Sequence, residues 1–119
     1  MHSTKRILLV DDNIEFLHLL SSSLQKQFQT YEAVGVDDAM KILETVAIDA
    51  VCSDFNMGDG TGVELLRMLR QKNMQLPVIL MSGMDGHCII CEVESYGADF
   101  CSKTDPDLLM KISAMLSCE

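Results

Sequence analysis

The sequence predicts an α/β fold in which a parallel β-sheet carries helices on both faces. Short apolar runs alternate with segments whose apolar residues recur every three or four positions, and this strand-then-helix pattern occurs five times. The 119 residues, 48% of them hydrophobic, are enough for one domain with a full core. Strands separated by helices pair in parallel through right-handed crossovers, which buries both faces of the sheet.

The first half of the chain predicts three strands and two helices. Mostly apolar runs typical of strands occupy residues 6–10, 31–34 and 49–53. Asp12 or Asn13 can cap the first helix, whose apolar stripe consists of Ile14, Leu17, Leu20, Leu24 and Phe28. Asp37 or Asp38 can cap the second helix, whose inward residues are Ala39, Ile42, Leu43 and Val46.

The second half predicts a loop, three helices and two strands. The glycine-rich segment 57–62 is the loop, and the helix after it carries Leu65, Leu66 and Leu69. The remaining strands occupy residues 78–81 and 98–101. The helix between them, at about residues 86–95, has a blurred apolar pattern and ends near Gly97. Asp105-Pro106-Asp107 marks the start of the last helix, whose buried stripe is Leu108, Leu109, Ile112 and Leu116.

Five such units predict a flavodoxin-like doubly wound (βα)5 fold with strand order 2-1-3-4-5, one common arrangement. In a parallel sheet, all the carboxyl ends of the strands lie at one edge. The first strand ends in Asp11 and Asp12, the third in Asp54 and the fourth in Ser82, while Lys103 follows the fifth. Because strands one and three are neighbours in this order, we expect the three carboxylates to share one pocket.

Three clustered carboxylates repel one another and favour a cation. At ~4 Å and an effective dielectric of about 20, two of them cost roughly 4 kcal/mol, which a hard cation such as Mg²⁺ can offset. A metal ion, a hydroxyl and an ammonium group together suit phosphoryl transfer, in which a carboxylate can be the nucleophile. Taken singly, each residue also has a structural explanation as a helix cap, a turn residue or a solvated lysine.

Composition excludes several classes of function. The net charge of −9 repels nucleic-acid phosphates, so we expect no direct nucleic-acid binding. No apolar run reaches membrane-spanning length, and too few apolar residues follow Lys5-Arg6 for a secretory signal. We therefore expect a cytoplasmic protein, without membrane contact, whose five cysteines are reduced. The Cys88/Cys91 spacing allows a redox or zinc site, or simply two small apolar residues on a helix.

Four stretches resemble the receiver domain of bacterial two-component response regulators: ILLVDDN (7–13), VCSDFNMGDGTGVELL (51–66), PVILMSG (77–83) and GADFCSK (97–103). The resemblance covers essentially the whole chain and implies one receiver domain over residues 1–119. It implies a phosphorylation-controlled binding module rather than an enzyme. Because no histidine has a phosphodonor context, the phosphoryl group is expected from a sensor histidine kinase or phosphotransfer protein. The expected recipient of the signal is a downstream output domain or protein.

The resemblance also implies a role for each residue of the pocket. Asp54 is the expected phosphoacceptor and Mg²⁺ the expected cofactor. Asp12 is then the main Mg²⁺ ligand, with Asp11 beside it binding directly or through water. The Asp54 carboxylate and the backbone carbonyl of Asn56 complete the metal site.

Three further residues belong to the implied switch. The Ser82 hydroxyl turns toward the phosphoryl group, Lys103 pairs with its oxygens, and the ring of Phe100 moves inward as Ser82 moves. The resulting population shift changes the face formed by the fourth helix, fifth strand and fifth helix. Thr104 stands where the family commonly has proline, so we expect a trans bond and an altered loop after Lys103.

Two alternatives stay open at this point. A degenerate receiver that binds partners without phosphorylation is compatible with Thr104, although the complete set of acidic, hydroxyl and lysine positions opposes it. A haloacid-dehalogenase-type phosphatase needs a second Asp two residues after its nucleophile on the first strand, where this chain has Asn13. The sequence also leaves open whether the chain is a complete regulator or part of a longer protein.

Overall fold

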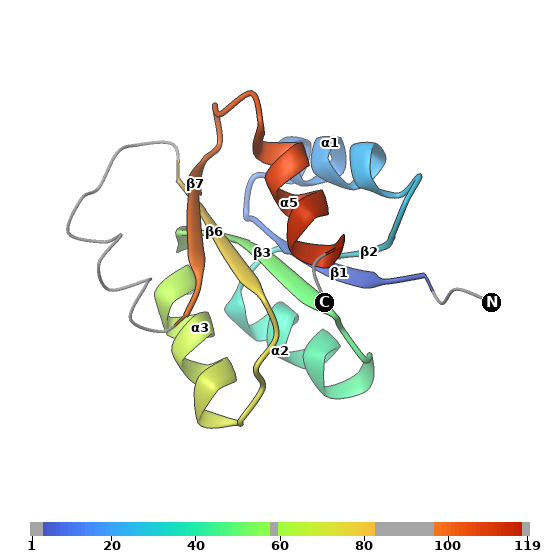
Figure 1. The fold of residues 1–119 in the computed structure, drawn as a ribbon. Coiled ribbons are helices and arrows are strands. Elements are labelled where there is room, and N and C mark those ends of the chain that lie inside the picture. The colour runs from blue at the N-terminus through green and yellow to red at the C-terminus, as the bar shows by residue number, and fades with distance from the viewer. Residues whose placement is uncertain (1–3, 58–59, 83–96, 118–119) are drawn as a thin grey trace.

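A computed structural model describes residues 4–57, 60–82 and 97–117 of the chain. Its centre is a parallel five-stranded sheet (Figure 1) made of β1 (Arg6–Val10), β2 (Gln29–Ala33), β3 (Ala50–Asp54), β6 (Val78–Ser82) and β7 (Asp99–Ser102). The strands lie in the order β2-β1-β3-β6-β7. Counted along the chain within this sheet, that is the predicted order 2-1-3-4-5, and the predicted doubly wound α/β fold is confirmed.

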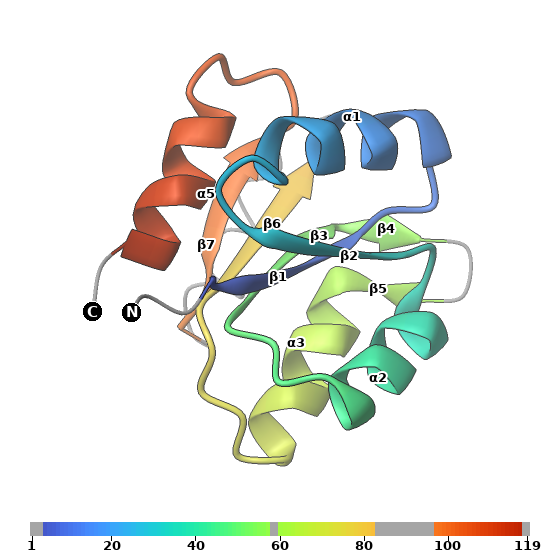
Figure 2. The ribbon, with the colours of Figure 1, turned by 90° about the vertical axis from the view of Figure 1, so that its right-hand side faces the viewer.

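The described helices cover both faces of the sheet. Helices α1 (Ile14–Leu24) and α5 (Leu108–Ser117) lie on one face, and α2 (Val36–Thr45) and α3 (Gly62–Gln71) lie on the other (Figure 2). The helix predicted at about residues 86–95, with its C-x-x-C spacing, lies outside the described residues. No helix within the described part of the chain is long and apolar enough to cross a membrane.

Successive side chains along a strand point to opposite faces of the sheet, so each face has its own hydrophobic core. In β1, Leu8 and Val10 pack with the core under α2 and α3, while Ile7 and Leu9 pack with the core under α1 and α5. All four side chains are fully buried. Because both faces of β1 are buried, its interior positions are apolar, and its two acidic residues come directly after the strand.

Several predicted boundaries were wrong by one to four residues. The strands predicted at 31–34, 49–53 and 98–101 are Gln29–Ala33, Ala50–Asp54 and Asp99–Ser102. Helix α1 ends at Leu24 rather than Phe28. The backbone N–H groups of Gln27 and Phe28 both donate to the Leu24 carbonyl, which closes the last turn before β2 begins.

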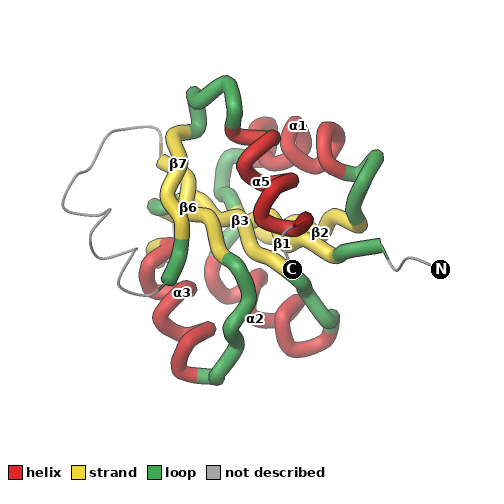
Figure 3. The backbone as a smooth tube through the Cα atoms, in the orientation of Figure 1, coloured by secondary structure: helices red, strands yellow, loops and turns green. Residues whose placement is uncertain are grey.

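Three expectations about local structure also need correction. The predicted loop at 57–62 overlaps a small antiparallel hairpin, β4 (Asn56–Met57) with β5 (Gly60–Thr61), which is labelled in Figure 2; strands are yellow in Figure 3. Gly35 rather than Asp37 or Asp38 is the N-cap of α2, and Asp38 instead accepts the Val34 N–H at 3.2 Å. Two residues of the predicted buried stripes are exposed: Ile14 and Leu109.

Candidate functional site

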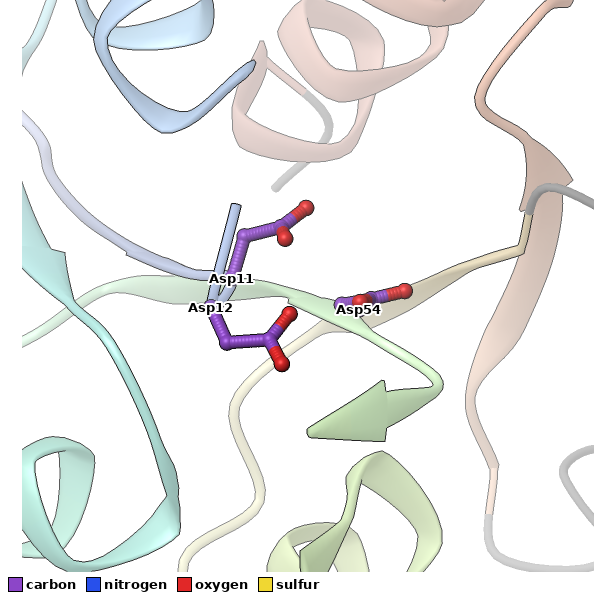
Figure 4. A group of neighbouring side chains, drawn as sticks. All are labelled: Asp11, Asp12 and Asp54. Atoms are coloured by element: carbon purple, nitrogen blue, oxygen red, sulfur yellow. The ribbon is translucent and has the colours of Figure 1, made fainter. Parts of the chain in front are cut away.

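The three predicted acidic residues meet at the carboxyl edge of the sheet. Asp11 and Asp12 directly follow β1, and Asp54 is the last residue of the neighbouring strand β3. Their side chains extend into the same space beyond the strands (Figure 4). One carboxylate oxygen from each residue lies within 4.8 Å of the others. The expected convergence of three carboxylates is therefore present in the structure.

Asp11 is fixed by its own backbone and by the start of α1. Its N–H donates to the Ala33 carbonyl at 3.0 Å, which extends the pairing with β2 by one residue. Its Oδ1 accepts the Asn13 N–H at 2.8 Å. The Asn13 side chain in turn accepts the Phe16 N–H at 3.2 Å, so Asn13 rather than Asp12 caps α1. Asp12 is exposed and is not needed as the cap.

Lys103 reaches into this acidic pocket from the loop after β7. Its Nζ atom lies 2.7 Å from Asp11 Oδ2 and 3.4 Å from Asp54 Oδ2. Its backbone N–H donates to the Ser82 carbonyl at 2.9 Å, which ties the loop to the end of β6. The bond to Thr104 is trans, as expected, since the described residues include no cis peptide bond. The replacement of proline by Thr104 has not kept Lys103 from the carboxylates.

The buried charges shift one another's pKa values. Burial raises the pKa of Asp54, the negative charge of Asp11 raises it further, and Lys103 opposes both effects only in part. Burial lowers the pKa of Lys103, but its contacts with Asp11 and Asp54 outweigh burial, so the net shift is upward. The pocket therefore favours the charged form of Lys103 and disfavours the ionised form of Asp54 relative to water.

The donor set fits a divalent cation. Asp11 is fully buried, and its Oδ2 makes no directed hydrogen bond although the Lys103 ammonium lies beside it. A buried carboxylate oxygen with an unused lone pair, next to two more carboxylates, is the oxygen environment that Mg²⁺ prefers. Asn56, whose backbone carbonyl is the fourth expected ligand, is the first residue of β4 and lies two residues after Asp54 in the sequence.

Ser82 and Phe100, the two residues of the predicted switch, lie on the neighbouring strands β6 and β7. Ser82 ends β6 one position beyond Met81, which pairs with Asp54, and it lies opposite Ser102 of β7. Phe100 pairs with Leu80 and packs, half-buried, against the core under α2 and α3. The structure describes one conformation of this pair of strands, and their movement stays a prediction.

The sequence did not single out two contacts of the site. A Cβ atom on Gly62, the first residue of α3, would lie 2.5 Å from the Asp54 carbonyl oxygen and 2.9 Å from Leu80 Cδ2. The sequence indicated only that Gly62 belongs to a glycine-rich loop, yet its missing side chain lets α3 begin against the end of β3. Phe16, on α1, places its ring 4.7 Å from the Lys103 Nζ atom. Neither contact has a local sequence signature.

Comparison with known proteins identifies the class. The family model of the response regulator receiver domain matches residues 7–113. The chain therefore belongs to the receiver domains of two-component response regulators. Receiver domains bind Mg²⁺ in an acidic pocket, generally accept a phosphoryl group, and interact with histidine kinases and output domains.

Among curated relatives, the regulatory protein VirG of Agrobacterium tumefaciens is 32% identical over 82 residues. This match covers 66% of the chain and 30% of VirG. The photosynthetic apparatus regulatory protein RegA of Rhodobacter capsulatus is 29% identical over 103 residues, covering 85% of the chain and 56% of RegA. The chain thus spans a third to about a half of the length of these relatives.

Solved receiver domains share the fold over nearly the whole chain. The non-phosphorylated HemR receiver domain of Leptospira biflexa aligns with a TM-score of 0.88 at 23% identity, covering 98% of this chain and 97% of that one. A CheY-like response regulator receiver domain protein of Methanospirillum hungatei aligns with a TM-score of 0.88 at 25% identity, covering 97% and 95%.

Proposed function

We propose that Asp54 is the phosphoacceptor of this receiver domain and that a phosphohistidine of a partner protein is its donor. The observation that carries the proposal is the convergence of Asp11, Asp12 and Asp54 at the edge of the sheet, with the Lys103 ammonium beside Asp11 and Asp54. In the reaction, a carboxylate oxygen of Asp54 forms a bond to phosphorus as the P–N bond to the donor imidazole breaks. The products are an aspartyl phosphate on this chain and a free histidine on the partner.

The carboxylates of Asp11, Asp12 and Asp54, with the backbone carbonyl of Asn56, are the proposed Mg²⁺ ligands. A bound Mg²⁺ supplies positive charge that offsets the negative charge of the transferring phosphoryl group. Lys103 supplies a second positive charge, because its ammonium already touches the Asp54 carboxylate. Asp11 holds that ammonium while Asp54 is unmodified.

The switch is proposed to follow from the new charge on Asp54. An aspartyl phosphate carries more acceptor oxygens than a carboxylate, so it attracts both the Lys103 ammonium and the Ser82 hydroxyl. Movement of Ser82 at the end of β6 leaves space toward which Phe100, on the neighbouring strand, can turn. This shift is proposed to change the surface of β7 and α5, together with the helix predicted at about residues 86–95, and a downstream output domain or protein would recognise that change.

The remaining parts of the proposal concern context. We infer that residues 1–119 act as one receiver domain in the cytoplasm, paired with a sensor histidine kinase or phosphotransfer protein. Slow hydrolysis of the aspartyl phosphate resets the domain, so it works as a switch rather than as an enzyme with turnover. The phosphatase alternative is not favoured, because the position that needs its second acid is Asn13, which caps α1.

A small phosphodonor tests the proposal without a partner protein. After incubation with acetyl phosphate, we expect the intact mass to increase by one phosphoryl group, only when Mg²⁺ is present. Asp54→Asn removes the nucleophile and should abolish the addition. A mass increase that persists in Asp54→Asn would show that another residue is the acceptor. A wild-type protein that is folded, binds Mg²⁺ and gains no mass would favour the degenerate receiver instead.

A further inference from the structure

We propose that Phe16 is a positioning residue for Lys103, holding the lysine ammonium inside the acidic pocket with the face of its ring. This inference rests on the proposed function and adds a residue to the same site. The Lys103 Nζ atom lies over the Phe16 ring, 4.7 Å from its centroid. That distance is within the ~6 Å over which an aromatic face attracts a cation.

The ammonium group is enclosed by three partners from three parts of the fold. Asp11 after β1 and Asp54 on β3 hold it at 2.7 Å and 3.4 Å, and the Phe16 ring of α1 lies against it as well. The lysine side chain is only 19% exposed. A cation–π contact is stronger when water is largely excluded, so this ring attracts the lysine ammonium more strongly than an exposed ring would.

The Phe16 side chain is held in a fixed position beside Lys103. Its side chain is half-buried and packs against the core under α1 and α5. Its backbone N–H is bonded to the Asn13 cap, so the residue belongs to the first, capped turn of α1. The ring is therefore held by the helix and the core, while Lys103 comes from a loop.

The loop fixes the backbone of Lys103 but not its side chain. The Ser102 hydroxyl lies 2.9 Å from the Thr104 hydroxyl and accepts the Thr104 N–H at 3.2 Å. These bonds hold the turn on either side of Lys103. The four-carbon lysine side chain keeps its many rotamers unless something restricts them. The Phe16 ring restricts them, so the ammonium has only a short way to move from Asp11 to a phosphoryl group on Asp54.

The test compares a variant that removes the ring face with one that keeps it. Phe16→Leu keeps an apolar side chain and should slow phosphorylation by acetyl phosphate in Mg²⁺ about two- to tenfold, the range expected for loss of one such contact. Phe16→Tyr keeps the ring and should react at the wild-type rate. The small donor removes any effect of partner docking. Leu19→Ala, on the exposed side of the same helix, is the matched control and should react normally.

Two further measurements separate positioning from packing. In Lys103→Gln, adding Phe16→Leu should slow the reaction no further, because the group that the ring positions is already absent. By NMR, the side-chain methylene protons next to the Lys103 ammonium should show a ring-current shift in wild type and Phe16→Tyr, and lose it in Phe16→Leu.

The results that would contradict this inference differ from those that would contradict the proposed function. Equal rates for wild type and Phe16→Leu overturn the inference, as does equal slowing in the Leu and Tyr variants. Absence of the ring-current shift in the wild-type protein also overturns it, and this result does not depend on how well any variant folds. A wild-type protein that accepts no phosphoryl group instead contradicts the proposed function, while the NMR measurement still tests the contact.

Discussion

At the scale of single residues, the site depends on side chains that would destabilise the fold if they stood alone. Asp11 is fully buried and ionisable, a combination that proteins tolerate when a partner of opposite charge is close. Lys103 is that partner. Removing one member of such a pair typically costs about 3–5 kcal/mol, because the other charge stays buried and unpaired. The residues proposed for the chemistry therefore also contribute to the stability of the sheet edge.

Gly62 shows that an absent side chain can matter as much as a charged one. In Gly62→Ala, the added Cβ would meet the Asp54 backbone oxygen at 2.5 Å, so α3 or β3 must shift. We expect the free energy of unfolding to fall by about 1–3 kcal/mol, measured by urea denaturation. Gly97→Ala is the control, since a Cβ there meets nothing within 4 Å. Its φ of +75° should cost about 1–2 kcal/mol from backbone strain, with no side-chain clash. Unchanged stability in Gly62→Ala would contradict the packing argument.

The sequence predicted the charged residues of the site far better than its uncharged ones. Asp11, Asp12, Asp54 and Lys103 could be found because each lies at or just after the carboxyl end of a predicted strand, and in a parallel sheet all such positions fall at one edge. Phe16 and Gly62 could not be found this way. Their importance lies in contacts with residues that are distant in sequence, and the contact distances exist only once the helices are docked.

At the scale of elements, the start of α1 helps to shape the acidic pocket beyond the first strand. The Asn13 side chain caps the helix, while the Asn13 backbone N–H binds Asp11 Oδ1. A single residue thus orients the helix that carries Phe16 and the carboxylate that holds Lys103. The predicted choice between Asp12 and Asn13 as cap is resolved in favour of Asn13, which leaves the Asp12 carboxylate directed toward the pocket (Figure 4).

The cap can be tested separately from the site. Asn13→Ala removes the acceptor for the Phe16 N–H and should lower the free energy of unfolding by about 1 kcal/mol, the usual cost of losing an N-cap. Asn13→Ser keeps a capping oxygen and should unfold within a few tenths of a kcal/mol of the wild type. Both variants keep the backbone bond to Asp11. Equal stability of the Ala variant and the wild type in urea would show that the cap is dispensable.

Helices and strands were predicted more accurately where many residues follow the same hydrophobic period. Strand β1 was predicted with its correct bounds because four consecutive apolar residues end abruptly in charge. The hairpin of β4 and β5 was missed because two-residue strands have no period to detect. The capping of α2 was misplaced because Asp37 and Asp38 both suit an N-cap, whereas the observed cap, Gly35, makes no side-chain bond.

At the scale of the whole molecule, a long-range arrangement converts an acidic chain into a cation site. The net charge of −9 is spread over the whole sequence, but the fold brings three of the acidic side chains together, with one oxygen atom from each within 4.8 Å of the others. Binding of Mg²⁺ to this site in the folded state alone must stabilise the fold by mass action.

Mg²⁺ should therefore raise the free energy of unfolding of the wild type. At a concentration about one hundred times its dissociation constant, the expected increase is roughly 2.7 kcal/mol. Asp12→Asn should lose most of this increase while folding normally without metal, because Asp12 is exposed. Urea denaturation with MgCl₂, compared with NaCl at equal ionic strength, measures the difference. An equal increase in wild type and Asp12→Asn would place the cation elsewhere.

The contact between Lys103 and both buried carboxylates has a consequence for ion selectivity. With all four groups ionised, three negative charges against one positive leave the cavity with a formal charge of −2. A sodium ion would neutralise only half of that excess, whereas a magnesium ion would balance it. The Lys103 ammonium thus acts as an internal counter-ion, so the formal charge that remains on the carboxylate cluster equals that of one divalent cation with opposite sign.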